Sequence, residues 1–145
     1  MDADNLSKLK DLTEKLIQRE AQISELTQKL DLVLNLTGVG IWVWNVITND
    51  LSWSPNMYTL FDRDESEAPL NYSHFISRVY PGDQERTNKA LEEAKNSAIK
   101  YDVVYRVVDR KGELKLIAAQ GKTVDHTMYG VCLDITQGTA LKNWR

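Results

Sequence analysis

Apolar residues recur at heptad spacing along the first 36 residues, and neither Gly nor Pro occurs before Gly38. The a and d positions of these heptads are Leu9, Leu12, Leu16, Arg19, Ile23, Leu26, Leu30 and Val33. Nearly four heptads with charged flanks predict a long helix that pairs as a coiled coil, most simply in a parallel homodimer. Arg19 places a charge in this stripe, which can set register at a cost in stability. The alternative is an amphipathic helix that packs against its own domain.

After Gly38 the pattern changes to short segments separated by turn residues. The expected elements are strands at 41–46 and 51–54, short helices at 54–62 and 73–80, a longer helix at 82–98, and strands at 100–109, 113–124 and 128–136. The last three strands predict an antiparallel meander. Several strands are apolar on both faces, which predicts a sheet that is covered on both sides. The short helices can cover one face, and the other requires the N-terminal helix or a second subunit.

Composition and charge exclude several classes of protein. The 145 residues are 42% hydrophobic and 27% charged, which suits one domain with an extension. The net charge of −3 predicts no nucleic-acid partner and no attraction to an anionic membrane. The sequence shows no signal peptide and no apolar run of membrane length, and Cys132 is its single cysteine. We therefore expect a cytoplasmic chain without direct membrane contact.

Three motifs follow one another in the second part of the chain. Trp42 and Trp44 form a W-x-W pair, and W-S-P follows at 53–55. The stretch YDVVYRVVDRKGELK begins at Tyr101, and a D-I-T signature ends the last strand. In this order and spacing, the motifs make residues 38–136 resemble a PAS domain, the five-stranded sensor module of signalling proteins. One departure is V-Y-P-G-D at 79–83, where the similar subgroup has V-H-P-D-D.

The resemblance implies an α+β fold: a five-stranded antiparallel sheet with short helices on one face, preceded by a long N-terminal helix. It divides the chain into the amphipathic or coiled-coil helix at 1–36, the PAS domain at 37–136 and an outgoing linker to an effector at 137–145. It also implies signal input for a larger protein, such as a histidine kinase, a cyclic-dinucleotide enzyme or a transcription regulator. Coiled-coil packing changes would carry the signal. In PAS proteins the D-I-T signature joins the last strand to the outgoing segment, so Asp134 and Thr136 are the expected relay residues.

The tryptophans have two interpretations. Period-two alternation places Trp42 and Trp44 on one face of their strand and Val43 on the other. The indoles either fill the core or line a small pocket for an apolar or planar ligand. The candidate pocket residues are Trp42, Trp44, Tyr58, Phe61, Phe75, Tyr105 and Cys132. The expected outer face of the sheet carries Val43, Val131, Leu133 and Ile135.

The resemblance also bears on cofactors. Flavin photochemistry in this family needs a reactive cysteine near the start of the long helix, but Cys132 lies on the last strand, where that branch has a flavin-contacting Gln. Its neighbours Val131 and Leu133 indicate an inert, buried thiol. His74 and His126 are poorly placed for haem, so we expect either no cofactor or an unidentified small ligand. Metal-ligand spacing is absent.

No nucleotide-binding or nucleophile motif occurs in the sequence, so we expect no catalysis by the chain itself. The carboxylates fall mostly on predicted helix faces, where solvated charge is expected. Besides the sensory module, two other functions stay open. One is a constitutive, ligand-free dimerisation or protein-interaction module. The other is a haem- or flavin-bearing redox or gas sensor.

Overall fold

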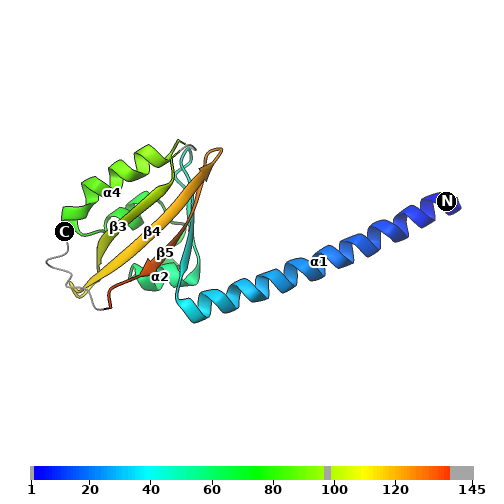
Figure 1. Cartoon of the computed structure of the whole chain (residues 1–145), viewed down its shortest axis with the longest axis horizontal. Helices are drawn as coiled ribbons and strands as arrows, with labels where there is room; N and C mark the ends of the chain where they lie inside the picture. The colour runs from blue at the N-terminus through cyan, green and yellow to red at the C-terminus, as the bar shows by residue number, and fades with distance from the viewer. Residues whose placement is uncertain (1, 97–98, 138–145) are drawn as a thin grey trace. The chain divides into compact units, whose positions relative to one another are not determined.

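The computed structural model describes residues 2–96 and 99–137. The expected outgoing linker falls almost entirely on 138–145, outside the described residues. The chain forms two units, divided between Thr37 and Gly38. Each unit is described by itself, and Figure 1 identifies their elements.

The first unit is a single helix, α1 (Ala3–Thr37). Its composition of Leu, Lys, Glu and Gln favours helix, and a Glu25–Lys29 ion pair of 3.0 Å joins two successive turns. No residue within α1 is buried. The apolar stripe is therefore exposed along its length, with Leu16 61% and Ile23 63% exposed. The helix ends at Thr37, and Gly38 follows it with a φ of +72°, a conformation that glycine adopts without strain.

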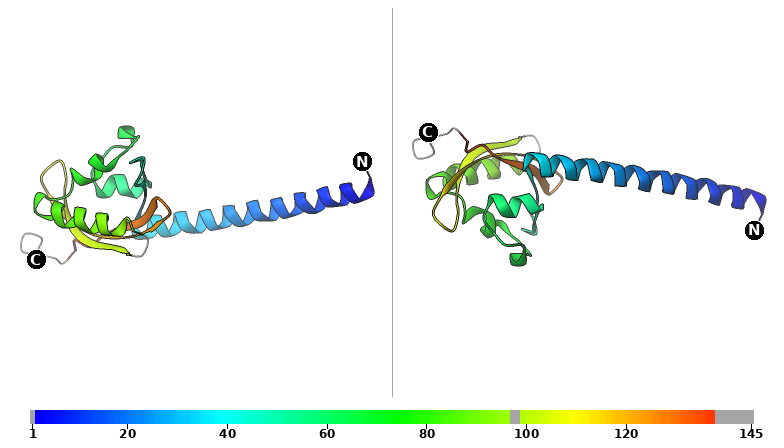
Figure 2. Two further views of the ribbon diagram at one scale, coloured as in Figure 1. Left: turned by 90° about the horizontal axis from the view of Figure 1, so that it is seen from above. Right: turned by 90° about the horizontal axis from the view of Figure 1, so that it is seen from below.

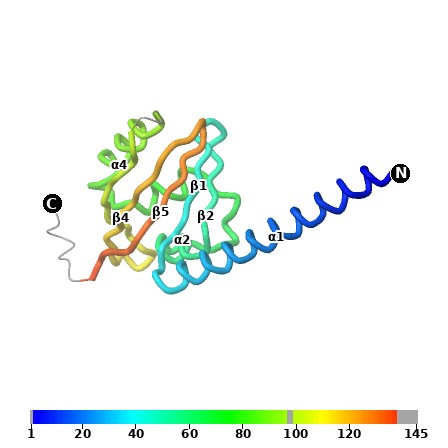
Figure 3. The backbone as a smooth tube through the Cα atoms, turned by 45° about the vertical axis from the view of Figure 1, so that its right-hand side comes forward, coloured from blue at the N-terminus to red at the C-terminus, as the bar shows by residue number. Residues whose placement is uncertain are grey.

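The second unit is built on a five-stranded antiparallel sheet. The strands are β1 (Gly40–Asn45), β2 (Leu51–Trp53), β3 (Tyr101–Val108), β4 (Leu114–Val124) and β5 (Thr127–Asp134). Their order across the sheet is β2-β1-β5-β4-β3, so the first and last strands in sequence are neighbours (Figure 3). The predicted meander is β3-β4-β5, and the α+β fold class is confirmed.

Helices cover one face of this sheet (Figure 2). They are α2 (Pro55–Leu60), the 3-10 turn η1 (Glu65–Glu67), α3 (Tyr72–Ile76) and α4 (Pro81–Ala94). Helix α3 ends four residues before the predicted helix at 73–80 does. Beyond it, Val79 forms a β-bridge with Val107, and the Tyr80 N–H donates to the Arg106 carbonyl. Pairing with the edge strand β3 therefore replaces the last predicted helical turn.

A buried ion pair joins α4 to β3. Asp83 is 2% exposed, and its carboxylate accepts hydrogen bonds from the Arg106 backbone N–H and from Nε and Nη2 of the same arginine, at 2.7–2.9 Å. The Tyr80 ring lies 4.2 Å from the Arg106 guanidinium. This contact gives a role to the Tyr at the position where the similar subgroup has His: its ring packs against the partly buried guanidinium of Arg106. Solvated charge is the expectation for most carboxylates on the predicted helices, but Asp83 is buried and fastens α4 to β3.

Candidate functional site

A small, partly open cavity lies between the helices and the inner face of the sheet. Its volume is about 30 Å³, enough for one or two water molecules. Strands β1, β2, β3 and β5 contribute residues to its wall, and so do helices α2, α3 and α4. The lining residues are Trp42, Trp44, Leu51, Trp53, Met57, Tyr72, Phe75, Leu91, Tyr101, Tyr105 and Cys132.

The Trp42 indole lies over two glycines of the sheet. Gly130 is its direct partner on β5, and Gly121 pairs with Gly130 from β4. A Cβ on Gly130 would lie 2.0 Å from the Trp42 ring, and one on Gly121 would lie 2.7 Å from it. Only residues without a side chain leave this space. The indole therefore packs directly against the sheet backbone, and the cavity lies in the space between this ring and the other lining residues.

Asn49 ties Trp44 to the start of α3. The Trp44 Nε1–H donates to Asn49 Oδ1 at 3.0 Å, and the Tyr72 backbone N–H donates to the same oxygen at 3.2 Å. The Tyr72 ring stacks on the Trp44 indole with 5.8 Å between centroids. Asn49 has a φ of +70°, which asparagine tolerates better than most residues. The turn between β1 and β2 thus positions two walls of the cavity at once.

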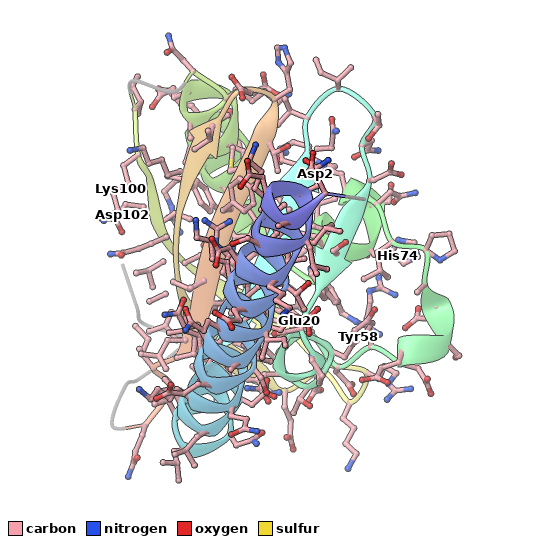
Figure 4. All side chains as sticks on the ribbon, turned by 90° about the vertical axis from the view of Figure 1, so that its right-hand side faces the viewer. Asp2, Glu20, Tyr58, His74, Lys100 and Asp102 are labelled. Carbon is pink, nitrogen blue, oxygen red and sulfur yellow. The ribbon has the colours of Figure 1, made fainter. Side chains whose placement is uncertain are left out.

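The aromatic rings of β2, α2 and α3 form one packed group behind the cavity. Phe61 is 0% exposed and lies 5.1 Å from Trp53 and 5.6 Å from Phe75 between ring centroids. It supports the cavity wall without lining it. Tyr58 packs edge-on against Trp53 at 5.3 Å but is itself only half-buried. Figure 4 shows Tyr58 and His74 near the short helices, and Lys100 and Asp102 at the β3 edge of the sheet.

The structure brings together five of the seven residues that the sequence places at a pocket: Trp42, Trp44, Phe75, Tyr105 and Cys132. Tyr58 and Phe61 lie outside the lining. The sequence reasoning missed Leu51, Trp53, Met57, Tyr72, Leu91 and Tyr101. For Tyr101 a signal existed, since it lies four residues before Tyr105 on one strand and therefore shares its face.

Three polar groups lie at the β3 and β5 side of the cavity. The Tyr105 hydroxyl is 3.6 Å from Cys132 Sγ. Burial raises the pKa of the Cys132 thiol to about 12, while hydrogen bonds from Tyr105 and Trp42 act in the opposite direction. Burial also raises the pKa of Tyr101 and Tyr105 well above their usual value. All three groups are therefore neutral at physiological pH, and Cys132 carries no reactive thiolate.

The two histidines lie away from the cavity lining. The Nδ1 atom of His74 accepts a hydrogen bond from the Asn71 N–H at 3.1 Å, which completes a capping box at the start of α3. His126 is exposed in the turn between β4 and β5. Among the described residues, no group of three or more His, Cys, Asp or Glu side chains is arranged to hold a metal ion.

The D-I-T signature forms a compact hydrogen-bonded end to β5. The Asp134 carboxylate accepts from both the backbone N–H and the hydroxyl of Thr136. The same hydroxyl oxygen accepts from the Leu116 N–H at 2.9 Å, and the Ile135 N–H donates to the Leu116 carbonyl at 2.8 Å. The end of β5 is therefore fastened to β4, the strand beside it.

The sheet face opposite the cavity carries exposed apolar side chains. Tyr129, Val131 and Leu133 are 52%, 44% and 41% exposed on β5. Val43 is half-buried on the neighbouring strand β1, where it pairs with Tyr129. Ile135 is half-buried just beyond the end of β5. The alternation along β5 places Cys132 inward and its two neighbours outward, as period two requires.

The sequence of this chain matches a known protein family. Residues 50–134 match the PAS fold family, which is more than half of the chain. The chain belongs to the PAS fold family. A PAS domain is a sensory input module, and the matched range includes the cavity residues from Leu51 to Cys132.

Several known PAS-containing proteins are similar to this chain. "Sensor protein FixL" of Bradyrhizobium diazoefficiens is 30% identical over 107 residues, covering 69% of this chain and 21% of FixL. "Probable diguanylate cyclase DgcE" of Escherichia coli is 21% identical over 138 residues, covering 91% of this chain and 12% of that protein. A sensory box histidine kinase/response regulator structure from Burkholderia thailandensis has a TM-score of 0.63 and 25% identity, covering 74% of this chain and 85% of that one. The chain thus spans a minor part of both full-length relatives.

None of the helices within residues 2–96 and 99–137 is both long and apolar enough to cross a bilayer.

Proposed function

We infer that this PAS domain provides signal input and dimerisation to a larger signalling protein, and that α1 pairs with a second copy as a parallel coiled coil. The similar proteins are a sensor protein, a probable diguanylate cyclase and a histidine kinase/response regulator. The name of each of these proteins describes a sensor or a signalling output. The two full-length relatives are several times longer than this chain. Any catalysis then resides in a domain other than the one described here.

The observation that carries this proposal is the direct connection between the helix and the cavity strand. Helix α1 ends at Thr37 and β1 begins at Gly40, and β1 carries Trp42 and Trp44. Two residues therefore separate the helix that carries the heptad stripe from the strand that carries part of the cavity wall. A change in the packing of β1 would be transmitted to the paired helices as a rotation or shift in register.

Insertions at Thr37 in the full-length signalling protein test this mechanism. One added helical residue rotates α1 by about 100° relative to β1. We expect such an insertion to change the output strongly, whereas seven residues, a complete heptad, restore the phase of the stripe and retain much of the normal output. Output is measured as the product of the effector domain. An output that is indifferent to insertion length would contradict the mechanical proposal.

The outer face of the sheet supports pairing of two copies as well. Its exposed apolar residues Tyr129, Val131 and Leu133 are next to one another on β5. Together with the exposed stripe of α1, they present apolar surface that a second subunit would cover.

A second function is favoured by the size of the cavity. A volume of about 30 Å³ is far below the several hundred Å³ of common ligand pockets. The tryptophans and tyrosines that surround it fill most of the interior. A constitutive dimerisation module with a packed core and no ligand has such an interior. Native mass spectrometry distinguishes the two functions, because a sensory domain purified with its ligand shows an added small mass on the dimer.

The same volume argues against a large cofactor in this conformation. A haem or an isoalloxazine ring requires the space now occupied by the Trp42 and Trp44 indoles. Neither histidine lines the cavity, and Cys132 is held as a neutral thiol. The residues present therefore do not fit a haem or a flavin adduct.

A further inference from the structure

The cavity wall contains a buried hydroxyl that the described part of the chain leaves without a partner. Tyr101 lines the cavity and is 2% exposed, and its hydroxyl makes no hydrogen bond to any described residue. By contrast, the Trp44 Nε1–H is paired with Asn49, and the Tyr105 hydroxyl lies beside Cys132 Sγ. Buried hydroxyls without an acceptor are uncommon and unfavourable. A guest that brings an acceptor atom into the cavity removes this penalty.

The charge of the wall limits what such a guest can be. The eleven lining residues include no Lys, Arg, His, Asp or Glu. The cation whose charge acts on the Tyr101 hydroxyl is Arg86. Its Nη2 lies 3.5 Å from the Asp83 carboxylate, so this cation already has an anion beside it. An anion placed in the cavity would lose its hydration without gaining a counter-ion. The wall therefore selects for a neutral molecule.

The dimensions of the cavity limit the guest further. Without displacement of its wall, the volume of about 30 Å³ holds only one or two water-sized groups. The walls formed by Trp53 and Tyr72 are only half-buried, and Trp53 lies on β2, an edge strand of three residues. These two side chains can move outward more easily than the fully buried Met57 or Tyr105. A guest enters with modest displacement of this outer wall.

The geometry points to a small neutral molecule with a short apolar body and one hydrogen-bond acceptor, such as a carbonyl oxygen, as the ligand of this cavity, with the Tyr101 hydroxyl as the donor that recognises it. This inference rests on the proposed sensory function. It makes Tyr101 the residue that distinguishes an acceptor-bearing guest from an apolar one of equal shape.

Three probes of nearly the same shape test the inference: acetone, isobutene and acetate. Each is titrated into the whole chain, and binding is followed by the indole N–H signals of the tryptophans in ¹H–¹⁵N spectra. Water solvates acetone far better than isobutene, so the informative quantity is the ratio of the two affinities in the original chain and in Tyr101→Phe. We expect the Tyr101 hydroxyl to shift this ratio about tenfold in favour of acetone, because it donates one buried hydrogen bond to the carbonyl. Acetate, which shares the shape but is charged, should not bind. Tyr101→Phe should lose this shift, and the exposed Tyr129→Phe should keep the affinity ratio of the original chain.

Thermal unfolding of the ligand-free variants gives a second, independent measurement. Tyr101→Phe removes a hydroxyl without a partner, so its Tm should equal or exceed that of the original chain. A clearly lower Tm would show that the hydroxyl is already satisfied and would overturn the inference. An acetone-to-isobutene affinity ratio that is the same in the original chain and in Tyr101→Phe, binding of acetate, or binding of none of the probes would overturn it too. The Thr37 insertions use no ligand, so they test the sensory function separately from these results.

Discussion

The Trp42 indole shapes the interior through the two residues beneath it. Gly121 and Gly130 present bare backbone to the ring, and Tyr101 meets it edge-on with 5.7 Å between centroids. The indole is thus held from below by the sheet and from the side by β3. Such close packing leaves little freedom to accept even one added methyl group.

Substitution of either glycine tests this packing. Gly130→Ala should lower the free energy of unfolding by about 2 kcal/mol, because the new Cβ overlaps both the Trp42 ring and the Gln120 carbonyl. Gly121→Ala should have a smaller effect, since its closest approach is 2.7 Å rather than 2.0 Å. Urea denaturation of the three proteins gives the comparison. The packing account is wrong if the two variants are equally stable, or if Gly130→Ala unfolds at the same urea concentration as the original chain.

Between elements, the Asp83–Arg106 pair holds α4 against β3. Burial alone would raise the pKa of Asp83, but hydrogen bonds from the side chain and backbone of Arg106 outweigh it and lower the pKa below 3.8. A carboxyl group whose pKa is lower in the folded state stabilises the fold above its unfolded pKa. That contribution is lost as the pH falls through the folded pKa.

Asp83→Asn should therefore destabilise the protein by about 3 kcal/mol at pH 7, because Arg106 loses its buried counter-ion. The difference between the variant and the original chain should shrink as the pH falls below 3.8. Chemical denaturation at pH 7 and pH 3 measures both effects. Asp62→Asn is the matched control, since it breaks a more exposed pair with Arg110. A penalty for Asp83→Asn that is equal at both pH values would contradict the ion-pair account.

The sequence predicted the elements better than the contacts between them. Periodicity located α1, the five strands and α4, and alternation placed Trp42, Trp44 and Cys132 on one face, because both depend on local geometry. The cavity contribution of Met57 and Leu91 depends on how α2 and α4 dock on the sheet, and no local pattern contains that information. The pairing of Asp83 with Arg106 joins residues 23 positions apart and escaped prediction for the same reason.

For the whole molecule, the exposed stripe of α1 predicts association. The stripe contains Arg19 at a d position, where two copies would bring like charges together in a parallel pair. A helix of 35 residues with no buried side chain gains little from its own fold. The proposed pairing with a second copy would remove its leucines from water.

Arg19→Leu should tighten the dimer by about tenfold or more, because a leucine completes the apolar core at this layer. Ile23→Asp should weaken the dimer strongly, whereas Gln28→Asp, on the outer side of the heptad, should leave it unchanged. Sedimentation equilibrium over a range of concentrations measures all three. If Ile23→Asp and Gln28→Asp associate like the original chain, α1 does not form the dimer.

The close packing of Trp42 also bears on how relatives of this domain can differ in sequence. A side chain at position 130 or 121 occupies the space of the indole, so a relative with alanine or a larger residue there needs a smaller residue at position 42. Exchanging the indole for a smaller group enlarges the cavity next to Tyr101 and Cys132. Residues 42, 121 and 130 should therefore vary together across the family. The residue at 130, on the sheet, then predicts how large a guest each relative can hold.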